Sequence, residues 1–66
     1  MADGNKVAER VRTYRERLGM TMAVLAEKSA VSAEVIAAVE AGEVYPALGI
    51  LVKLSRALGQ RLGTFM

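Results

Sequence analysis

Residues 21–42, TMAVLAEKSAVSAEVIAAVEAG, decide the fold, because they contain two short helical patterns joined by a tight turn. Thr21 and Ser32 each precede one pattern, where a hydroxyl can accept a hydrogen bond from an N–H group of the first helical turn. The connection, residues 29–31, is three residues long, a length that sets two helices at a steep angle. This spacing predicts a helix-turn-helix over residues 21–42.

The apolar positions of the two patterns give each expected helix one inward face. Leu25 and Ala26 form this face in the first helix. Ile36 and Val39, three residues apart, form it in the second. The segments on either side must then cover these faces to complete a core.

The segment before this stretch has the pattern of an amphipathic helix. Its apolar residues recur at intervals of four, three and four, and arginines occupy other positions. The apolar residues are Val7, Val11, Tyr14 and Leu18, and the arginines are Arg10, Arg12, Arg15 and Arg17. Gly19 is placed to end this helix in a left-handed cap. The polar leader, residues 1–5, is expected to be disordered.

The segment after it predicts the closing helices, within residues 47–66. Leucines recur with helical spacing at Leu48, Leu51, Leu54 and Leu58, and Gly59 follows as a cap. Leu62 and Phe65, three residues apart, suggest a fifth short helix. No alternating strand pattern is present. The expected fold class is all-α, a five-helix bundle forming a single domain over residues 1–66.

The composition excludes several classes of function. The 66 residues include no cysteine and no histidine, so disulfides, the usual zinc ligand sets and thiol or imidazole catalysis are absent. No glycine-rich phosphate loop appears, and neither an enzyme nor a cofactor is expected. No apolar run approaches the ~20 residues of a membrane span, and the N-terminus lacks the apolar core of a signal peptide. A cytoplasmic location without membrane contact is expected.

The charge is unevenly distributed around a formal net value of +2. Residues 20–47 carry one lysine against four glutamates, whereas the segments on both sides are basic. The two helices of the central stretch are therefore the acidic part of a mildly basic protein.

The order of residues resembles the XRE family, the phage-repressor-like helix-turn-helix DNA-binding domains. The resemblance runs without a gap from about Val7 to Phe65. Its residues are Val11-Arg12-x-Tyr14-Arg15, Gly19-Met20-Thr21, Leu25-Ala26-Glu27-Lys28, Val31-Ser32, Ile36, Val39-Glu40-x-Gly42, Pro46-x-Leu48, Leu51, Leu54 and Ala57-Leu58-Gly59.

The resemblance implies a repressor-like bundle that acts as a transcriptional regulator on double-stranded DNA. In such domains the third helix enters the major groove, and homodimers bind two half-sites about one helical turn apart. Arg15 and Glu40 match the family's arginine–glutamate pair, which orients the third helix. Two unrelated surface charges are the alternative interpretation of these residues.

The DNA-binding positions that the resemblance implies are unusual in chemistry. The groove-facing positions are Met22, Ser32, Ala33, Glu34, Ala37 and Ala38. The family usually places hydrogen-bonding side chains there, because base edges are read by hydrogen bonds. Alanine can instead contact a thymine methyl group, and Glu34 can accept from a cytosine amino group or simply stabilise the start of its helix.

Phosphate contacts are expected from basic side chains and from the N-termini of the two central helices, including Thr21. The candidate cations are Arg10, Arg12 and Arg17 in the first helix and Lys28 in the second. Arg12 is best placed in the family pattern, with a solvated surface charge as the alternative for each. Lys53, Arg56 and Arg61 are expected on another side of the bundle.

Two further expectations follow. The row Met22, Val24, Ala33, Val35, Ala37, Ala38, Ala41 and Val44 is apolar for a surface that faces phosphates. It suggests an alternative function as a protein–protein interaction module, although an alanine-rich helix also explains the row. Because many members of the family continue beyond this domain, the chain is expected either to be the N-terminal part of a longer regulator with a further C-terminal domain or to lack a strong dimer contact of its own.

Overall fold

The computed structural model describes residues 3–65, which form four α-helices and one short 3₁₀ helix. They are α1 (Asp3–Arg17), α2 (Met22–Ser29), α3 (Ala33–Glu40), α4 (Leu48–Ala57) and η1 (Leu62–Thr64). Among these described residues there is no strand, which confirms the all-α class. The segment expected to form a fifth short helix forms η1, a 3₁₀ helix of three residues, so the described residues contain four α-helices and one 3₁₀ helix.

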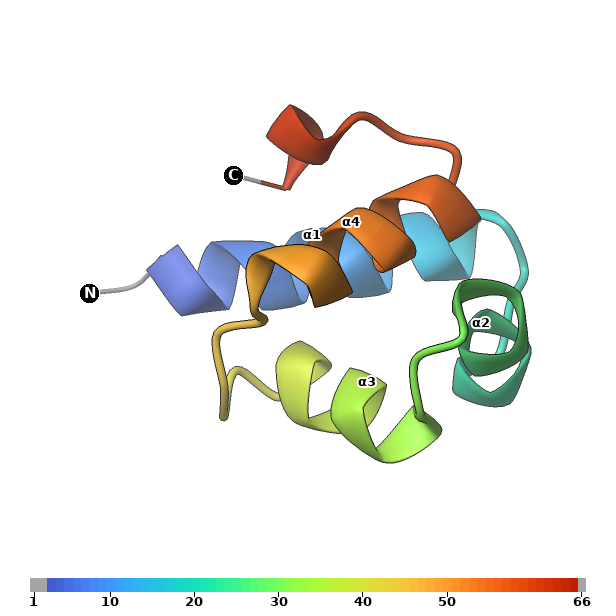
Figure 1. The fold of residues 1–66 in the computed structure, drawn as a ribbon, viewed down its shortest axis with the longest axis horizontal. Helices are drawn as coiled ribbons and strands as arrows, with labels where there is room; N and C mark the ends of the chain where they lie inside the picture. The colour runs from blue at the N-terminus through green and yellow to red at the C-terminus, as the bar shows by residue number, and fades with distance from the viewer. Residues whose placement is uncertain (1–2, 66) are drawn as a thin grey trace.

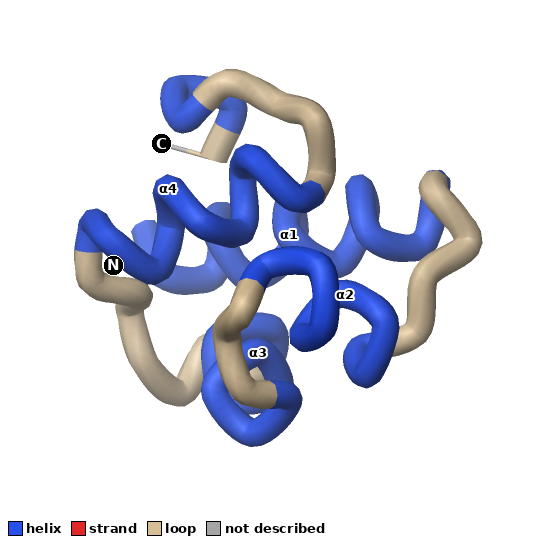
Figure 2. Tube along the Cα trace, turned by 45° about the vertical axis from the view of Figure 1, so that its right-hand side comes forward, coloured by secondary structure: helices blue, strands red, loops and turns tan. Residues whose placement is uncertain are grey.

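Helix α3 packs against both α1 and α2, and α2 also packs against α4. In Figure 1, α3 lies along the lower edge of the molecule with α2 at one end, and η1 lies at the opposite edge. Figure 2 shows the short loop that connects α2 to α3, with the two helix axes at a steep angle. The helix-turn-helix thus lies at the surface, supported from behind by α1 and α4.

The helices enclose one hydrophobic core. Its buried side chains come from all four α-helices, from the loops and from the C-terminal segment: Val7, Val11, Leu25, Val31, Ile36, Val39, Leu51, Leu54, Leu58 and Phe65. Phe65 is the largest of them, and its ring meets the ring of Tyr14 edge-to-face, with centroids 5.7 Å apart. Of the inward faces expected for the two central helices, Leu25, Ile36 and Val39 have no exposed surface, and Ala26 is partly buried against the core.

Several details of the helices differ from the sequence-based expectations. Helix α1 begins at Asp3, so the backbone of residues 3–5 is helical and not a disordered leader; residues 1–2 lie outside the described part. Leu18 and Leu48 continue apolar stripes in the sequence, yet they are 52% and 61% exposed. Each lies at the end of its stripe, where no neighbouring helix covers it. None of the helices in residues 3–65 has the length and apolarity needed to cross a membrane.

Candidate nucleic-acid interface

A buried ion pair fixes α3 on α1. Nε of Arg15 donates to Oε2 of Glu40 at 2.7 Å, and Nη2 donates to Oε1 at 3.0 Å. The side chain of Arg15 is 10% exposed and that of Glu40 is 2% exposed. A planar guanidinium that bonds both carboxylate oxygens fixes orientation as well as distance. Arg15 and Glu40 are therefore in the contact that the family resemblance implied, and the interpretation as unrelated surface charges is wrong.

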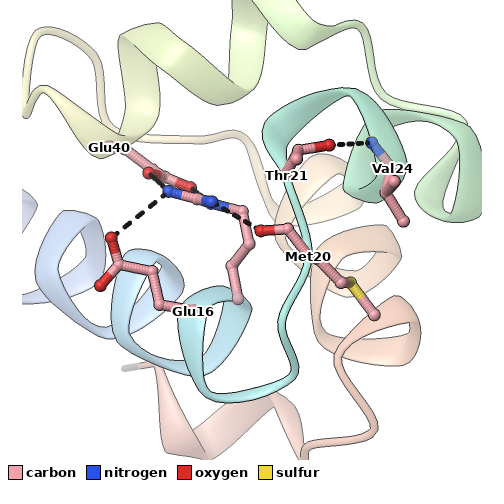
Figure 3. Close-up of polar contacts among 6 residues, drawn as sticks. Glu16, Met20, Thr21, Val24 and Glu40 are labelled. Atoms are coloured by element: carbon pink, nitrogen blue, oxygen red, sulfur yellow. Dashed lines mark hydrogen bonds and ion pairs between the residues drawn. The ribbon is translucent and has the colours of Figure 1, made fainter.

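Arg15 also binds the chain that leads into α2. Its Nη1 donates to the carbonyl oxygen of Met20 at 2.8 Å, and the carboxylate of Glu16 lies 3.8 Å from Nη2 (Figure 3). The hydrogen bond to Glu40 raises the pKa of Arg15 above its ordinary value, although burial opposes this effect. One charged side chain thus positions the start of α2 and the end of α3 together. No sequence pattern indicates the contact with the Met20 carbonyl, because that contact depends on the path of the backbone.

Hydroxyl side chains cap both helices of the helix-turn-helix. Oγ1 of Thr21 accepts from the N–H of Val24 at 3.1 Å, as Figure 3 shows. Oγ of Ser32 accepts from the N–H of Val35 at 3.2 Å. Both expected N-caps are confirmed. Each cap engages the third N–H group of its helix, and the N–H groups of the first two helical residues have no partner within an α-helix.

The turn between α2 and α3 contains a strained residue. Ala30 has φ of 62° and ψ of 26°, the left-handed conformation in which glycine is the usual residue. Its N–H still donates to the carbonyl oxygen of Ala26 at 2.9 Å. The buried hydroxyl of Ser29 accepts from the N–H of Val31 at 3.2 Å. Ser29 is the last residue of α2, so the connection starts one residue later than the sequence suggested.

The residues that the resemblance assigns to DNA lie on the outer side of these two helices and of α1. The exposed ones are Arg12, Thr21, Lys28, Ser32, Ala33, Glu34 and Ala37. Met22 and Ala38 are half-buried, and Met22 packs against the core. Met22 is therefore partly a core residue, with less surface for a ligand than the sequence suggested.

The basic side chains of α1 differ in the groups that they contact. Nη1 of Arg10 donates to the carbonyl oxygen of Thr64 at 3.2 Å, so this side chain helps to hold η1. The guanidinium of Arg17 lies 5.2 Å from the centre of the Tyr14 ring. Arg12 is exposed and lines a shallow, open hollow of about 400 Å³ between α1 and the end of α3, together with Glu9. Arg12 is thus an exposed α1 cation beside the end of α3.

The same surface carries apolar side chains. Val24 of α2 and Val35 of α3 are each 37% exposed, and each is the residue whose N–H the cap engages. Within residues 3–65 no group of three His, Cys, Asp or Glu side chains is placed to hold a metal ion. The chemistry of this surface is therefore that of a binding face, with short apolar side chains, one acid and flanking cations.

Comparisons with known proteins agree with this geometry. A family model described as Helix-turn-helix matches residues 11–65. A search of curated proteins found no match. Among solved structures, the restriction-modification controller protein C.AhdI from Aeromonas hydrophila matches with a TM-score of 0.93 and 27% sequence identity, over 100% of both chains. This match contains no residues beyond the domain, so it lends no support to the expected further C-terminal domain.

The family match covers most of the chain, including the capped helices and the Arg15–Glu40 pair. Proteins of this kind act by binding DNA and are not enzymes. The chain belongs to the helix-turn-helix family, among the XRE-like DNA-binding regulators of transcription.

Proposed function

We propose that this protein binds specific sequences of double-stranded DNA as a homodimer, with α3 of each copy in the major groove. The observation that carries the proposal is the fixed orientation of α3. Its C-terminal end is held by the Arg15–Glu40 pair, while its N-terminal end is capped by Ser32 and exposed. A recognition helix must be held in a fixed orientation, because its N-terminal residues contact base edges in the major groove.

Phosphate contacts would come from exposed cations and from helix N-termini. Arg12 on α1 and Lys28 on α2 are exposed, and neither has a salt-bridge partner among the described residues. Thr21 and Ser32 accept from the third N–H group of their helices, so the first two N–H groups of each remain for a phosphate oxygen. Such contacts position a protein on DNA and supply most of its affinity.

Base contacts would come from the exposed side of α3. Ala33, Ala37 and Ala38 offer methyl groups that can contact thymine methyl groups, with Met22 at the edge of the same surface. Glu34 is exposed in the first turn and can accept from the amino group of cytosine. This set favours half-sites in which thymine methyl groups and a cytosine amino group line the major groove.

Selection from a random duplex pool at low and at moderate salt tests the proposal. We expect enrichment of a two-fold symmetric site, and an affinity that falls steeply as salt rises. Binding of all duplexes with equal affinity would contradict sequence specificity. Failure to bind any duplex at low salt would contradict the DNA-binding role itself.

A second function is favoured by Val24 of α2 and Val35 of α3, which expose apolar surface on the helix-turn-helix. In this alternative the helix-turn-helix binds another protein through that surface, with weak or no DNA binding. Apolar association responds little to salt, whereas binding through phosphates weakens steeply. The same salt titration therefore separates the two functions.

A further inference from the structure

The exposed polar chemistry of α3 is limited to one carboxylate. Among the eight residues of α3, only Glu34 and Glu40 have polar side chains, and Glu40 is bonded to Arg15 inside the fold. Glu34 is exposed in the first turn, and the salt bridges among residues 3–65 do not involve it. A carboxylate accepts hydrogen bonds and donates none. The exposed side chains of α3 can therefore accept a hydrogen bond from a base, but they cannot donate one.

This acceptor-only surface is complementary to cytosine. In the major groove guanine presents two acceptors, adenine presents an acceptor beside its amino donor, and thymine presents an acceptor beside its methyl group. Cytosine presents only its N4 amino donor. A carboxylate repels the acceptor of any other base, so Glu34 favours cytosine at the position that it faces.

The surface next to Glu34 consists of methyl groups. Ala37 and Ala38 follow Glu34 by three and four residues, a spacing that brings side chains to the same face of a helix with Cβ atoms about 5–6 Å apart. Ala37 is exposed and Ala38 is half-buried. The methyl group of alanine can contact the C5-methyl group of a pyrimidine in the major groove. The helix thus offers an acceptor and an apolar contact side by side.

We propose that α3 recognises 5-methylcytosine, so that methylation of cytosine at the binding site strengthens the complex. This inference rests on the proposed function, because it names the base that the DNA-binding helix recognises. 5-Methylcytosine has its amino donor on C4 and its methyl group on the adjacent C5. Glu34 accepts from the amino group, and Ala37 packs against the methyl group. Thymine has the methyl group without the donor, and cytosine has the donor without the methyl group.

The two contacts differ in how strongly they discriminate. Burial of one methyl group favours binding by about fourfold, so one methylated cytosine in each half-site favours a homodimer by about fifteenfold. A hydrogen bond matched to one base discriminates against a mismatched base by roughly tenfold or more. The preference for 5-methylcytosine over thymine should therefore exceed the preference over unmethylated cytosine.

Selection from two random duplex pools tests the inference. One pool contains cytosine, and the other contains 5-methylcytosine in place of every cytosine. We expect tighter binding to the methylated pool, with one modified base enriched at a fixed position in each half-site. Single duplexes with 5-methylcytosine, cytosine or thymine at that position should then give dissociation constants that rise in this order. A duplex methylated only outside the selected site is the control and should bind like the unmethylated one.

Two results of these measurements would overturn the inference. The first is a dissociation constant for 5-methylcytosine equal to or higher than that for cytosine at the selected position. The second is a selected site that contains no cytosine at all.

Glu34→Gln tests the acceptor. The amide of glutamine donates as well as accepts, so this variant should bind thymine as well as 5-methylcytosine while it keeps the gain from C5-methylation. Glu27→Gln is the matched control, because it removes the same charge from an exposed position on α2. The control should leave the preference among the three bases unchanged. A Glu34→Gln variant that still rejects thymine as the wild type does would argue against the inference.

Ala37→Gly tests the methyl contact. This variant should lose the gain of about fourfold per half-site from C5-methylation and keep the preference for cytosine over thymine. Each result is a ratio of two affinities of one protein, so partial unfolding of the variant changes both affinities equally and leaves the ratio intact. An Ala37→Gly variant with the full gain from methylation would show that Ala37 makes no such contact and would refute the assignment.

The two pools also separate this inference from the proposed function. Sequence-specific binding with equal affinity for both pools would overturn the recognition of 5-methylcytosine and leave the proposed function intact. Absence of binding to both pools at low salt would overturn the proposed function, and this inference with it.

Discussion

The guanidinium of Arg15 bonds both carboxylate oxygens of Glu40, at 2.7 and 3.0 Å, and so joins α1 to α3 across 25 residues of sequence. The two groups have almost no contact with solvent. A buried pair of this kind contributes little net stability by itself, but it fixes one geometry, and the loss of one partner leaves a buried charge without compensation.

Replacement of one partner alone should therefore lower the stability of the domain strongly. Glu40→Ala and Arg15→Ala are each expected to lower the free energy of unfolding by about 3–5 kcal/mol, measured by urea denaturation. The double variant Arg15→Met with Glu40→Leu should be more stable than either single variant, because it leaves no buried charge. A double variant less stable than both would contradict this account of the pair.

The raised pKa of Arg15 gives this pair a defined dependence on pH. Because the folded-state pKa lies above the unfolded value, the contribution is fully present below the ordinary arginine pKa and is lost only as the pH rises through the folded value. The difference in unfolding free energy between wild type and Arg15→Met should therefore be constant across neutral and mildly alkaline pH.

Ala30 offers a substitution that should stabilise the domain. Its φ of 62° is unfavourable for a residue with a Cβ atom, so Ala30→Gly should raise the free energy of unfolding by about 1 kcal/mol. Ala41→Gly is the matched control, since Ala41 ends α3 with φ of −79° and should gain nothing. Thermal denaturation measures both, and a shift of roughly 4–8 °C is expected for Ala30→Gly.

Arg12→Ala should weaken DNA binding without changing base preference. The loss of one phosphate contact should reduce the slope of log K against log salt by about 0.9, with a similar loss of affinity for every duplex. Lys53→Ala is the control, because Lys53 is exposed on α4, outside the helix-turn-helix. Equal effects of the two substitutions would indicate net charge as the cause, rather than a contact by Arg12.

Glu34→Gln separates two roles of one carboxylate. If Glu34 accepts from cytosine in the groove, the substitution should alter the preferred base at that position and raise affinity for unrelated duplexes, because a negative charge leaves the phosphates. If Glu34 only stabilises the start of α3, the variant should lose about 0.3–1 kcal/mol of stability and keep its preferred sequence. Selection of bound duplexes and urea denaturation of both proteins distinguish these outcomes.

The sequence predicted best what depends on neighbouring residues. The caps Thr21 and Ser32 and the turn at Ala30 involve atoms within a few residues of one another, and their chemistry is visible in the local pattern. The Arg15–Glu40 contact spans 25 residues and was found through the family resemblance, since no local rule pairs these charges.

The features that the sequence did not predict depend on residues that are distant in the chain and close in the fold. The periodicity that places Leu18 and Leu48 on apolar stripes continues past the point where another helix covers them, so both are exposed. The expected fifth short helix is a 3₁₀ turn and not an α-helix, and Gly63 within it is a poor helix former. The contact of Arg10 with the Thr64 carbonyl spans 54 residues and left no signal in the sequence.

The position of Phe65 along the chain has a consequence for biosynthesis. This side chain is the largest in the core and comes after every other core residue, and its ring closes against Tyr14. A ribosome adds roughly 5–20 residues per second, so the nascent helices wait several seconds for the ring that seals them. During that interval the emerging polypeptide exposes apolar surface. Chaperones can bind this surface before residue 65 leaves the exit tunnel.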